Sequence, residues 1–164
     1  MTSFCNLNGK RALVATCLNE KAVPYASAVT APLGVRLKIC NVSEEGQLEL
    51  VIREATEALG GLDFVVHSIA WAPLEDLHGR VIDSSREGFE KAITISCHSF
   101  AELGRLAMTH MPAGGSLITM TYHGAREVVP NYGVMGPIKA ALESLVRYMA
   151  AECGPAGIRV HAEL

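Results

Sequence analysis

The chain has 164 residues, 49% of them hydrophobic, and a formal net charge of -3. This length predicts one domain with its own core, because such a chain buries roughly 68–70% of its unfolded surface. The negative charge and the scattered basic residues argue against nucleic acid and a membrane surface as partners. The five cysteines and six histidines show no metal-ligand spacing, and the N-terminal residues show no secretory leader. We therefore expect reduced thiols, a cytoplasmic location and no metal site.

The first predicted element is a strand over residues 11–18, RALVATCL, which follows the turn signal Asn8-Gly9. In dinucleotide-binding folds a glycine-rich turn after this strand lets the backbone approach a pyrophosphate. Here no glycine occurs between Gly9 and Gly34. We therefore interpret residues 11–18 as a core strand rather than as the start of a cofactor loop.

The next predicted elements are a short helix over residues 23–31, a strand over residues 35–42 and a helix over residues 43–59. The helix over residues 43–59 has the clearest pattern, since its apolar residues recur at helical spacing and Gly60-Gly61 follows it. Residues 62–69 are predicted as a strand buried on both faces. Ser68, Ile69 and Ala70 then lie at the carboxyl end of a strand, where open α/β sheets bind ligands. Trp71 is predicted to pack rather than to form a substrate platform.

The second half continues the alternation of helices and strands. Its predicted elements are a loop (residues 73–86), a long helix (85–111), a strand (115–122), a helix that Gly154-Pro155 ends, and a strand (158–161). This alternation predicts an α/β fold, a reduced Rossmann-like, doubly wound, mostly parallel sheet of about five strands with helices on both faces. We expect one domain over residues 1–164. The strand order near the N-terminus stays open, and a partner chain could complete the sheet edge.

Two tyrosines and a lysine form the candidate catalytic group. Tyr122 ends a predicted strand, Tyr132 follows ten residues later, and Lys139 follows after seven more. Seven residues make two helical turns, so Tyr132 and Lys139 share a face if the helix already runs at Tyr132. Pro137 leaves two alternatives: the helix begins there with proline in its first turn, or it begins earlier and loses one backbone bond.

The chemistry of this group suits hydride transfer to a carbon conjugated with a carbonyl. A phenol can hydrogen-bond an oxygen that becomes anionic, and a nearby ammonium lowers the cost of that charge. The alternative interpretation of both tyrosines is packing, because each lies where an amphipathic aromatic side chain is common.

The sequence around these residues resembles that of the enoyl-acyl carrier protein reductases of bacterial fatty acid synthesis, within the short-chain dehydrogenase/reductase superfamily. The resembling stretches are VHSIAWAPLEDLHGRVIDSSREGF, ISCHSF, TYHGAREVVPNYGVMGPIK and KAALESLVRYMAAECGPAGIRVHA, with LNGKRALV and LNEKAVPY near the start. The resemblance implies NADH-dependent reduction of trans-2-enoyl thioesters on acyl carrier protein, and a homo-oligomer.

The resemblance also implies roles for single residues. Tyr132 would hydrogen-bond the enolate oxygen, Lys139 would hold the nicotinamide ribose, and Tyr122 would assist at the pocket wall. The segment Ser68, Ile69 and Ala70 would run alongside the nicotinamide ribose. Ala72 would lie near the acyl thioester.

The remaining cofactor contacts implied by the resemblance are those of Leu18, Asn41 and Val42. Asn41 stands where the family carries an acidic residue beside the adenine. An amide still hydrogen-bonds an adenine amino group, but it accepts more weakly than a carboxylate. The alternative interpretation of Asn41 is a cap for the following helix.

Two parts of the family pattern are missing. The chain passes from RALV straight to ATCLNEKA. Relative to the family, on the order of 25 residues are absent, which correspond to one helix and half a strand. The first two strands of the family would therefore be joined into one. After IRVHA only Glu163-Leu164 follows, without the glycine-proline turn, helical lid and last strand of the family. The second hypothesis is therefore a non-catalytic, oligomerising remnant without dinucleotide binding.

Overall fold

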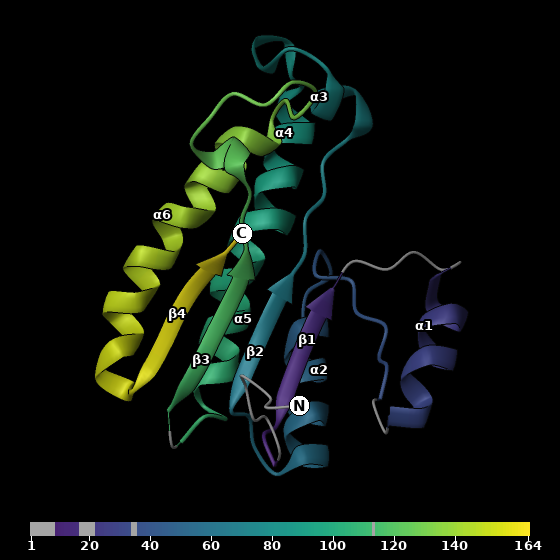
Figure 1. Cartoon of the computed structure of the whole chain (residues 1–164), viewed down its shortest axis with the longest axis vertical. Helices are drawn as coiled ribbons and strands as arrows, with labels where there is room; N and C mark the ends of the chain where they lie inside the picture. Colours follow the sequence, from purple (N-terminus) through teal and green to yellow (C-terminus); the bar gives the residue numbers. More distant parts are fainter. Residues whose placement is uncertain (1–8, 17–21, 34–35, 113) are drawn as a thin grey trace, which may run out of the picture.

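The computed structural model describes residues 9–16, 22–33, 36–112 and 114–164. Strands and helices alternate along the described chain (Figure 1). The elements are β1 (Ala12–Thr16), α1 (Ala22–Thr30), α2 (Gln47–Leu59), β2 (Phe64–Ser68), α3 (Leu74–His78), α4 (Arg86–Ile93), α5 (Ser99–Met108), β3 (Gly115–Met120), α6 (Met135–Cys153) and β4 (Ile158–Glu163). A π-helical turn, Thr94–His98, joins α4 to α5. No helix in this described part is long and apolar enough to cross a membrane.

The four strands form one parallel sheet in the order β1-β2-β3-β4. One row across the sheet runs from Leu13 to Val65, then to Leu117 and Val160. Val65, Leu117 and Val160 in this row are all buried. The predicted parallel α/β sheet is therefore present, with four strands in the described residues rather than about five.

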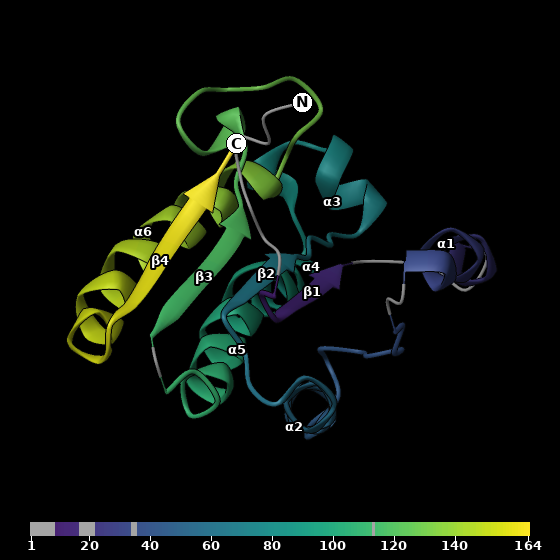
Figure 2. The same ribbon diagram turned by 60° about the horizontal axis from the view of Figure 1, so that its bottom comes forward.

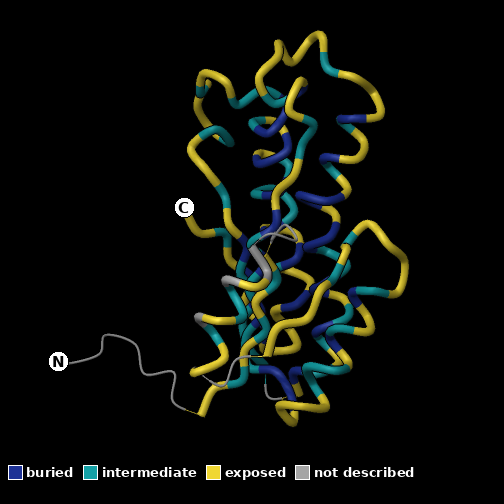
Figure 3. The backbone as a smooth tube through the Cα atoms, turned by 90° about the vertical axis from the view of Figure 1, so that its right-hand side faces the viewer, coloured by how far each residue is buried: buried dark blue, intermediate teal, exposed yellow. Residues whose placement is uncertain are grey.

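The helices that connect these strands lie on one face of the sheet. Figure 2 shows α2, α5 and α6 on the same side of the strands. A side-chain Cβ built at Gly104 in α5 would lie 2.6 Å from Met149 Cε of α6 and 3.2 Å from Leu117 Cδ1 of β3. These two helices therefore meet the sheet at the same place. The buried residues concentrate between the sheet and the helices (Figure 3).

The prediction of helices on both faces does not hold for the described residues. The strand order never reverses, and right-handed crossovers that always step in one direction place α2, α5 and α6 on the same face, while α1 lies to the side of β1 (Figure 1). On the other face Val14 is 57% exposed and Met120 is 36% exposed. A doubly wound sheet needs a reversal of strand order, which these four strands lack.

The predicted strand over residues 35–42 is not formed in its described part. Residues 36–41 have no strand assignment, and Ile39 is 77% exposed. The Lys38 ammonium instead pairs with the Glu54 carboxylate of α2 at 2.8 Å, while Cys40 and Val42 pack against the core. The segment is thus anchored to α2, so it does not extend the sheet beyond β1.

Two helix predictions are corrected in their boundaries. The helix predicted from residue 43 begins at Gln47, after Gly46 in the left-handed conformation. The long helix predicted over residues 85–111 begins as expected, since the Ser85 hydroxyl accepts the Gly88 N–H at its N-terminus. The π-helical turn then divides it into α4 and α5.

Candidate active site

The candidate catalytic residues lie beyond the carboxyl end of β3. The strand arrows in Figure 1 all point toward the end of the molecule that holds α3 and the start of α6. Tyr122 follows β3, and its ring lies against that of Tyr132, with ring centroids 4.8 Å apart and planes at 56°. Lys139 of α6 is only 4% exposed, and its ammonium donates to the Met120 carbonyl of β3 at 2.7 Å.

The start of α6 decides between the two alternatives that Pro137 left open. The helix begins at Met135, so Pro137 lies in its first turn and Tyr132 precedes the helix. Proline is tolerated there because its missing N–H would have no partner within the helix. Tyr132 and Lys139 therefore do not share a helical face, and Tyr132 is held by the loop instead.

Close backbone packing holds that loop. Gly133 has a φ of 34°, and a Cβ there would lie 2.2 Å from the Asp76 carbonyl oxygen of α3. The Val134 N–H donates to the same oxygen at 3.3 Å. A Cβ at Gly124 would lie 2.4 Å from Tyr132 Cδ1, so the turn after Tyr122 covers one side of the Tyr132 ring. Two glycines thus allow the contacts that fix Tyr132.

Burial keeps the Tyr132 phenol neutral. Its pKa is raised above the ordinary value, first by desolvation and then by the neighbouring Tyr122. The Lys139 ammonium is not among the causes of this shift. At neutral pH Tyr132 is therefore a hydrogen-bond donor rather than a phenolate.

The carboxyl end of β2 contributes a second wall. Ser68 is half-buried, Ile69 is buried and Ala70 is exposed, while Ala72 packs partly against the core. Trp71 is 37% exposed and lies outside the buried core. The structure therefore brings the predicted residues of β2 and β3 to one end of the sheet.

Buried polar residues whose contacts the spacing arguments missed connect these walls. Ser96 of the π-helical turn accepts the Trp71 N–H at 2.8 Å and donates to the Trp71 carbonyl at 2.9 Å. Its neighbour Cys97 is buried, and its pKa is raised by desolvation and partly lowered by the charge of Lys139. The helical spacing predicts that Ser96 faces inward, but it does not predict which groups Ser96 and Cys97 contact.

His67 lies beneath the site with no exposed surface. Its Nε2 lies 2.8 Å from the Ser99 hydroxyl, and its Nδ1 lies 3.0 Å from the Thr119 hydroxyl. The Ser99 hydroxyl also donates to the Ile95 carbonyl, and the Thr119 hydroxyl donates to the His67 carbonyl. Desolvation, and then the charge of Lys139, lower the His67 pKa to about 4.

The predicted adenine-side residues lie apart from this group. Asn41 is exposed, and its side chain accepts the Ser43 N–H at 3.1 Å and donates to Glu44 at 2.9 Å. These contacts form a local turn rather than a cap, since α2 begins only at Gln47. Val42 packs partly against the core, and Leu18 lies outside the described residues. A hollow of about 370 Å³ between α2 and α5 includes none of the predicted site residues.

The parallel sheet with its connecting helices defines a Rossmann-like protein, with the candidate tyrosines and lysine at the carboxyl end of β3. The family model described as enoyl-(acyl carrier protein) reductase matches residues 7–162. The chain therefore belongs to the enoyl-(acyl carrier protein) reductase family, and the resemblance noted in the sequence is confirmed.

The relatives in sequence carry the same description. The chain is 41% identical to the NADH enoyl-acyl carrier protein reductase 2 of Rhizobium meliloti (strain 1021) over 145 residues, which cover 88% of this chain and 53% of the relative. It is 38% identical to the enzyme FabI of Aquifex aeolicus over 183 residues, 95% of this chain and 68% of that protein. This aligned region is longer than the 164 residues of the chain. Some residues of the Aquifex protein within the aligned region therefore have no counterpart in this chain.

Solved structures agree with the fold. The reductase of Anaplasma phagocytophilum, solved in complex with NAD, matches with a TM-score of 0.83 and 39% identity over 92% of this chain and 57% of that one. The Aquifex aeolicus reductase matches with a TM-score of 0.84 over 92% of this chain and 59% of that one. The chain thus spans little more than half the length of these structures.

Proposed function

We propose that this chain carries the reactive end of an NADH-dependent reductase of trans-2-enoyl thioesters. NADH, when bound, supplies the hydride that adds to the β-carbon of the enoyl group. The electron pair of the double bond then moves to the carbonyl oxygen, and Tyr132 stabilises this enolate by donating a hydrogen bond. A proton added at the α-carbon completes the saturated thioester. The observations that support this most are the buried Lys139, which binds the Met120 carbonyl at the end of β3, and the paired rings of Tyr122 and Tyr132 after that strand.

The described residues fit the nicotinamide end of the cofactor better than the adenine end. Lys139 is fixed by Met120 where the carboxyl ends of β2 and β3 converge, and we assign it to the nicotinamide ribose together with Ser68, Ile69 and Ala70. At the adenine end the amide of Asn41 is engaged by its own turn. We therefore propose that Asn41 and Val42 contribute weakly; Leu18, the third residue that the resemblance assigns to this end, lies outside the described residues.

The substrate side of the proposal follows from Tyr122 and Ala72. Tyr122 is 42% exposed and can form the pocket wall, and Ala72 lies on the segment that follows β2. The relatives are named for acyl carrier protein substrates, and we propose the same thioester class here. A homo-oligomer and a cytoplasmic location belong to the proposal, supported by the open sheet face and by the unpaired thiols of Cys40, Cys97 and Cys153.

The second candidate function is a non-catalytic, oligomerising member of the family. It is favoured by the chain's span of about half of its first relative and by the sheet face that the described helices leave open. We treat residues 1–164 as one domain, incomplete relative to the family, under both candidates.

The deciding experiment is titration of the purified chain with NADH, followed by addition of a short trans-2-enoyl thioester in the same cell. The reductase proposal predicts NADH binding in the micromolar range and loss of absorbance at the reduced nicotinamide band. A Tyr132→Phe variant should bind NADH equally and lose at least about tenfold in kcat, since one charge-assisted hydrogen bond is removed. A folded chain that binds no NADH at millimolar concentration contradicts the proposal and leaves the non-catalytic candidate.

A further inference from the structure

The π-helical turn Thr94–His98 is the place where the two walls of the site meet. A π-helical turn is wider than an α-helical one and occurs mostly as a short insertion, frequently at functional sites. Here Ile95, Ser96 and Cys97 are three consecutive buried residues. The turn therefore buries three adjacent side chains that point in different directions, whereas a regular amphipathic helix buries only one stripe along its surface.

Ser96 binds both backbone polar groups of Trp71. The serine is fully buried, and its hydroxyl accepts from the Trp71 N–H and donates to the Trp71 carbonyl. The two residues are 25 positions apart, so the contact joins α4–α5 to the segment after β2. One side chain thereby satisfies two backbone groups of a segment that lies outside the strands and helices.

The Trp71 ring is held on its outer side. The Lys91 ammonium of α4 lies 4.9 Å from the ring centroid, within the range of a cation–π contact. Trp71 is fixed through its backbone by Ser96 and through its ring by Lys91, yet 37% of it stays exposed. An aromatic surface that is both fixed and exposed can contact a ligand at little entropic cost.

The same turn also reaches the catalytic side. The Lys139 charge acts on Cys97, and Ser99, just after the turn, binds His67 of β2. Any shift of the turn therefore moves the segment after β2 relative to Lys139.

We propose that Ser96 is a positioning residue that fixes residues 69–72, and that the exposed Trp71 ring is a wall of the site on the thioester side. This inference rests on the proposed reductase function for its ligand, an acyl thioester. The fixing of the segment by Ser96 can be tested without any ligand.

The test uses the single tryptophan of the chain. Selective ¹⁵N-tryptophan labelling gives one backbone amide signal, that of Trp71, in the intact protein. In Ser96→Ala the hydrogen exchange of this amide should accelerate by about tenfold, because its acceptor is removed. Ser99→Ala is the matched control: it removes a buried hydroxyl from the same helix and should leave Trp71 exchange within about twofold of the parent.

Ser96→Cys keeps the side-chain volume with a weaker hydrogen-bonding group, and it covers the case in which the alanine variant does not fold. It should also accelerate Trp71 exchange. Equal Trp71 exchange in the parent and in a folded Ser96 variant overturns the proposal. So does acceleration by Ser99→Ala as large as that by Ser96→Cys, because it would indicate general loosening.

An activity measurement then tests the thioester side. If the parent chain turns over, Trp71→Leu should raise the KM for the enoyl thioester by about tenfold, with kcat and NADH affinity within about twofold of the parent. Equal effects on NADH affinity and thioester KM contradict a thioester-side wall. If the parent chain binds no NADH, the reductase function fails while the exchange measurement still decides the role of Ser96.

Discussion

A buried histidine under the candidate catalytic residues makes the stability of the fold sensitive to acid. His67 is fully buried between the hydroxyls of Ser99 and Thr119, and its pKa is lowered to about 4. In an unfolded chain the imidazole has its ordinary pKa of about 6.5. Between these two values the unfolded state binds more protons, so acid favours unfolding.

The stability that neutral His67 contributes is therefore fully present above pH 6.5 and is lost as the pH falls toward 4. The loss amounts to at most about 3 kcal/mol. Urea unfolding at pH 7, 5.5 and 4.5 should show this decline in the parent and a flatter dependence in His67→Asn. His161→Asn, an exposed histidine on β4, serves as the control. A decline of the same slope in His67→Asn would show that other groups carry the acid sensitivity.

At the residue scale the sequence predicted a candidate catalytic group but not the buried contacts around it. Tyr122, Tyr132 and Lys139 were identified by spacing and family words, and the structure brings them to the end of β3. Ser96 and His67 gave no such signal, because their contacts join residues 25 and 32 positions apart. A buried serine or histidine gains a role only when the fold supplies its partner.

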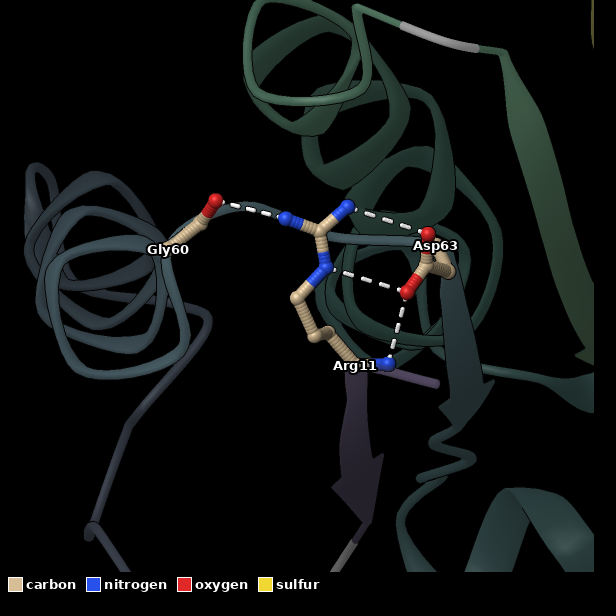
Figure 4. Close-up of polar contacts among 3 residues, drawn as sticks. All are labelled: Arg11, Gly60 and Asp63. Atoms are coloured by element: carbon tan, nitrogen blue, oxygen red, sulfur yellow. Dashed lines mark hydrogen bonds and ion pairs between the residues drawn. The ribbon is translucent and has the colours of Figure 1, made fainter. Parts of the chain in front are cut away.

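At the element scale one arginine joins the amino ends of β1 and β2 to the end of α2 (Figure 4). The Arg11 guanidinium donates to both carboxylate oxygens of Asp63 at 3.0 Å and to the Gly60 carbonyl at 2.6 Å. The backbone N–H of Arg11 also donates to the Asp63 carboxylate at 2.7 Å. This bidentate geometry has the best alignment that a guanidinium and a carboxylate can reach.

Arg11 holds the pKa of Asp63 well below its ordinary value, chiefly through the side-chain hydrogen bonds. A carboxylate with a lowered pKa stabilises the fold above its ordinary pKa, and this contribution is lost as the pH falls below that value. Asp63→Asn should therefore lower the thermal midpoint by a few degrees at pH 7 and by less at pH 3, as thermal melts can show.

The control for this pair is Asp83→Asn, which breaks an exposed pair of Arg80 and Asp83 with a separation of 3.5 Å. Exposed pairs of this kind contribute little to stability, so the midpoint should not change. Equal midpoints of the parent and Asp63→Asn would show that the Arg11 contacts do not hold β1 and β2 together.

The elements themselves were predicted better than their ends. Periodicity located α2, α6 and all four strands, whereas the start of α6 at Met135 depends on packing of the preceding loop against α3. The π-helical turn was missed because an inserted residue barely changes an apolar pattern over a helix of this length.

At the scale of the whole molecule the open sheet face is the main departure from a Rossmann-like protein. All-parallel sheets occur almost only with both faces covered. Here α2, α5 and α6 cover one face, and the other carries Val14, Val66, Ile118 and Met120, with Val14 and Met120 the most exposed.

This face should bind an apolar dye. The folded chain is expected to increase the fluorescence of anilinonaphthalene sulfonate at pH 7, and Val14→Lys should reduce that signal by about half by placing a charge in the apolar surface. Val128→Lys is the matched control, since Val128 is 99% exposed and lies in a loop. An equal reduction by both variants, or none by Val14→Lys, contradicts the assignment of the dye to this face.

The sequence by itself determined the family, the parallel α/β class and the candidate Tyr–Lys group. Periodicity indicates the helices and strands, and short sequence motifs indicate the residues that they carry. Tertiary structure decided which elements share a face and which buried hydroxyls meet the site. One constant direction of right-handed crossovers placed α2, α5 and α6 on the same side of the sheet. Both outcomes depend on contacts between residues distant in the chain, which a local pattern does not contain.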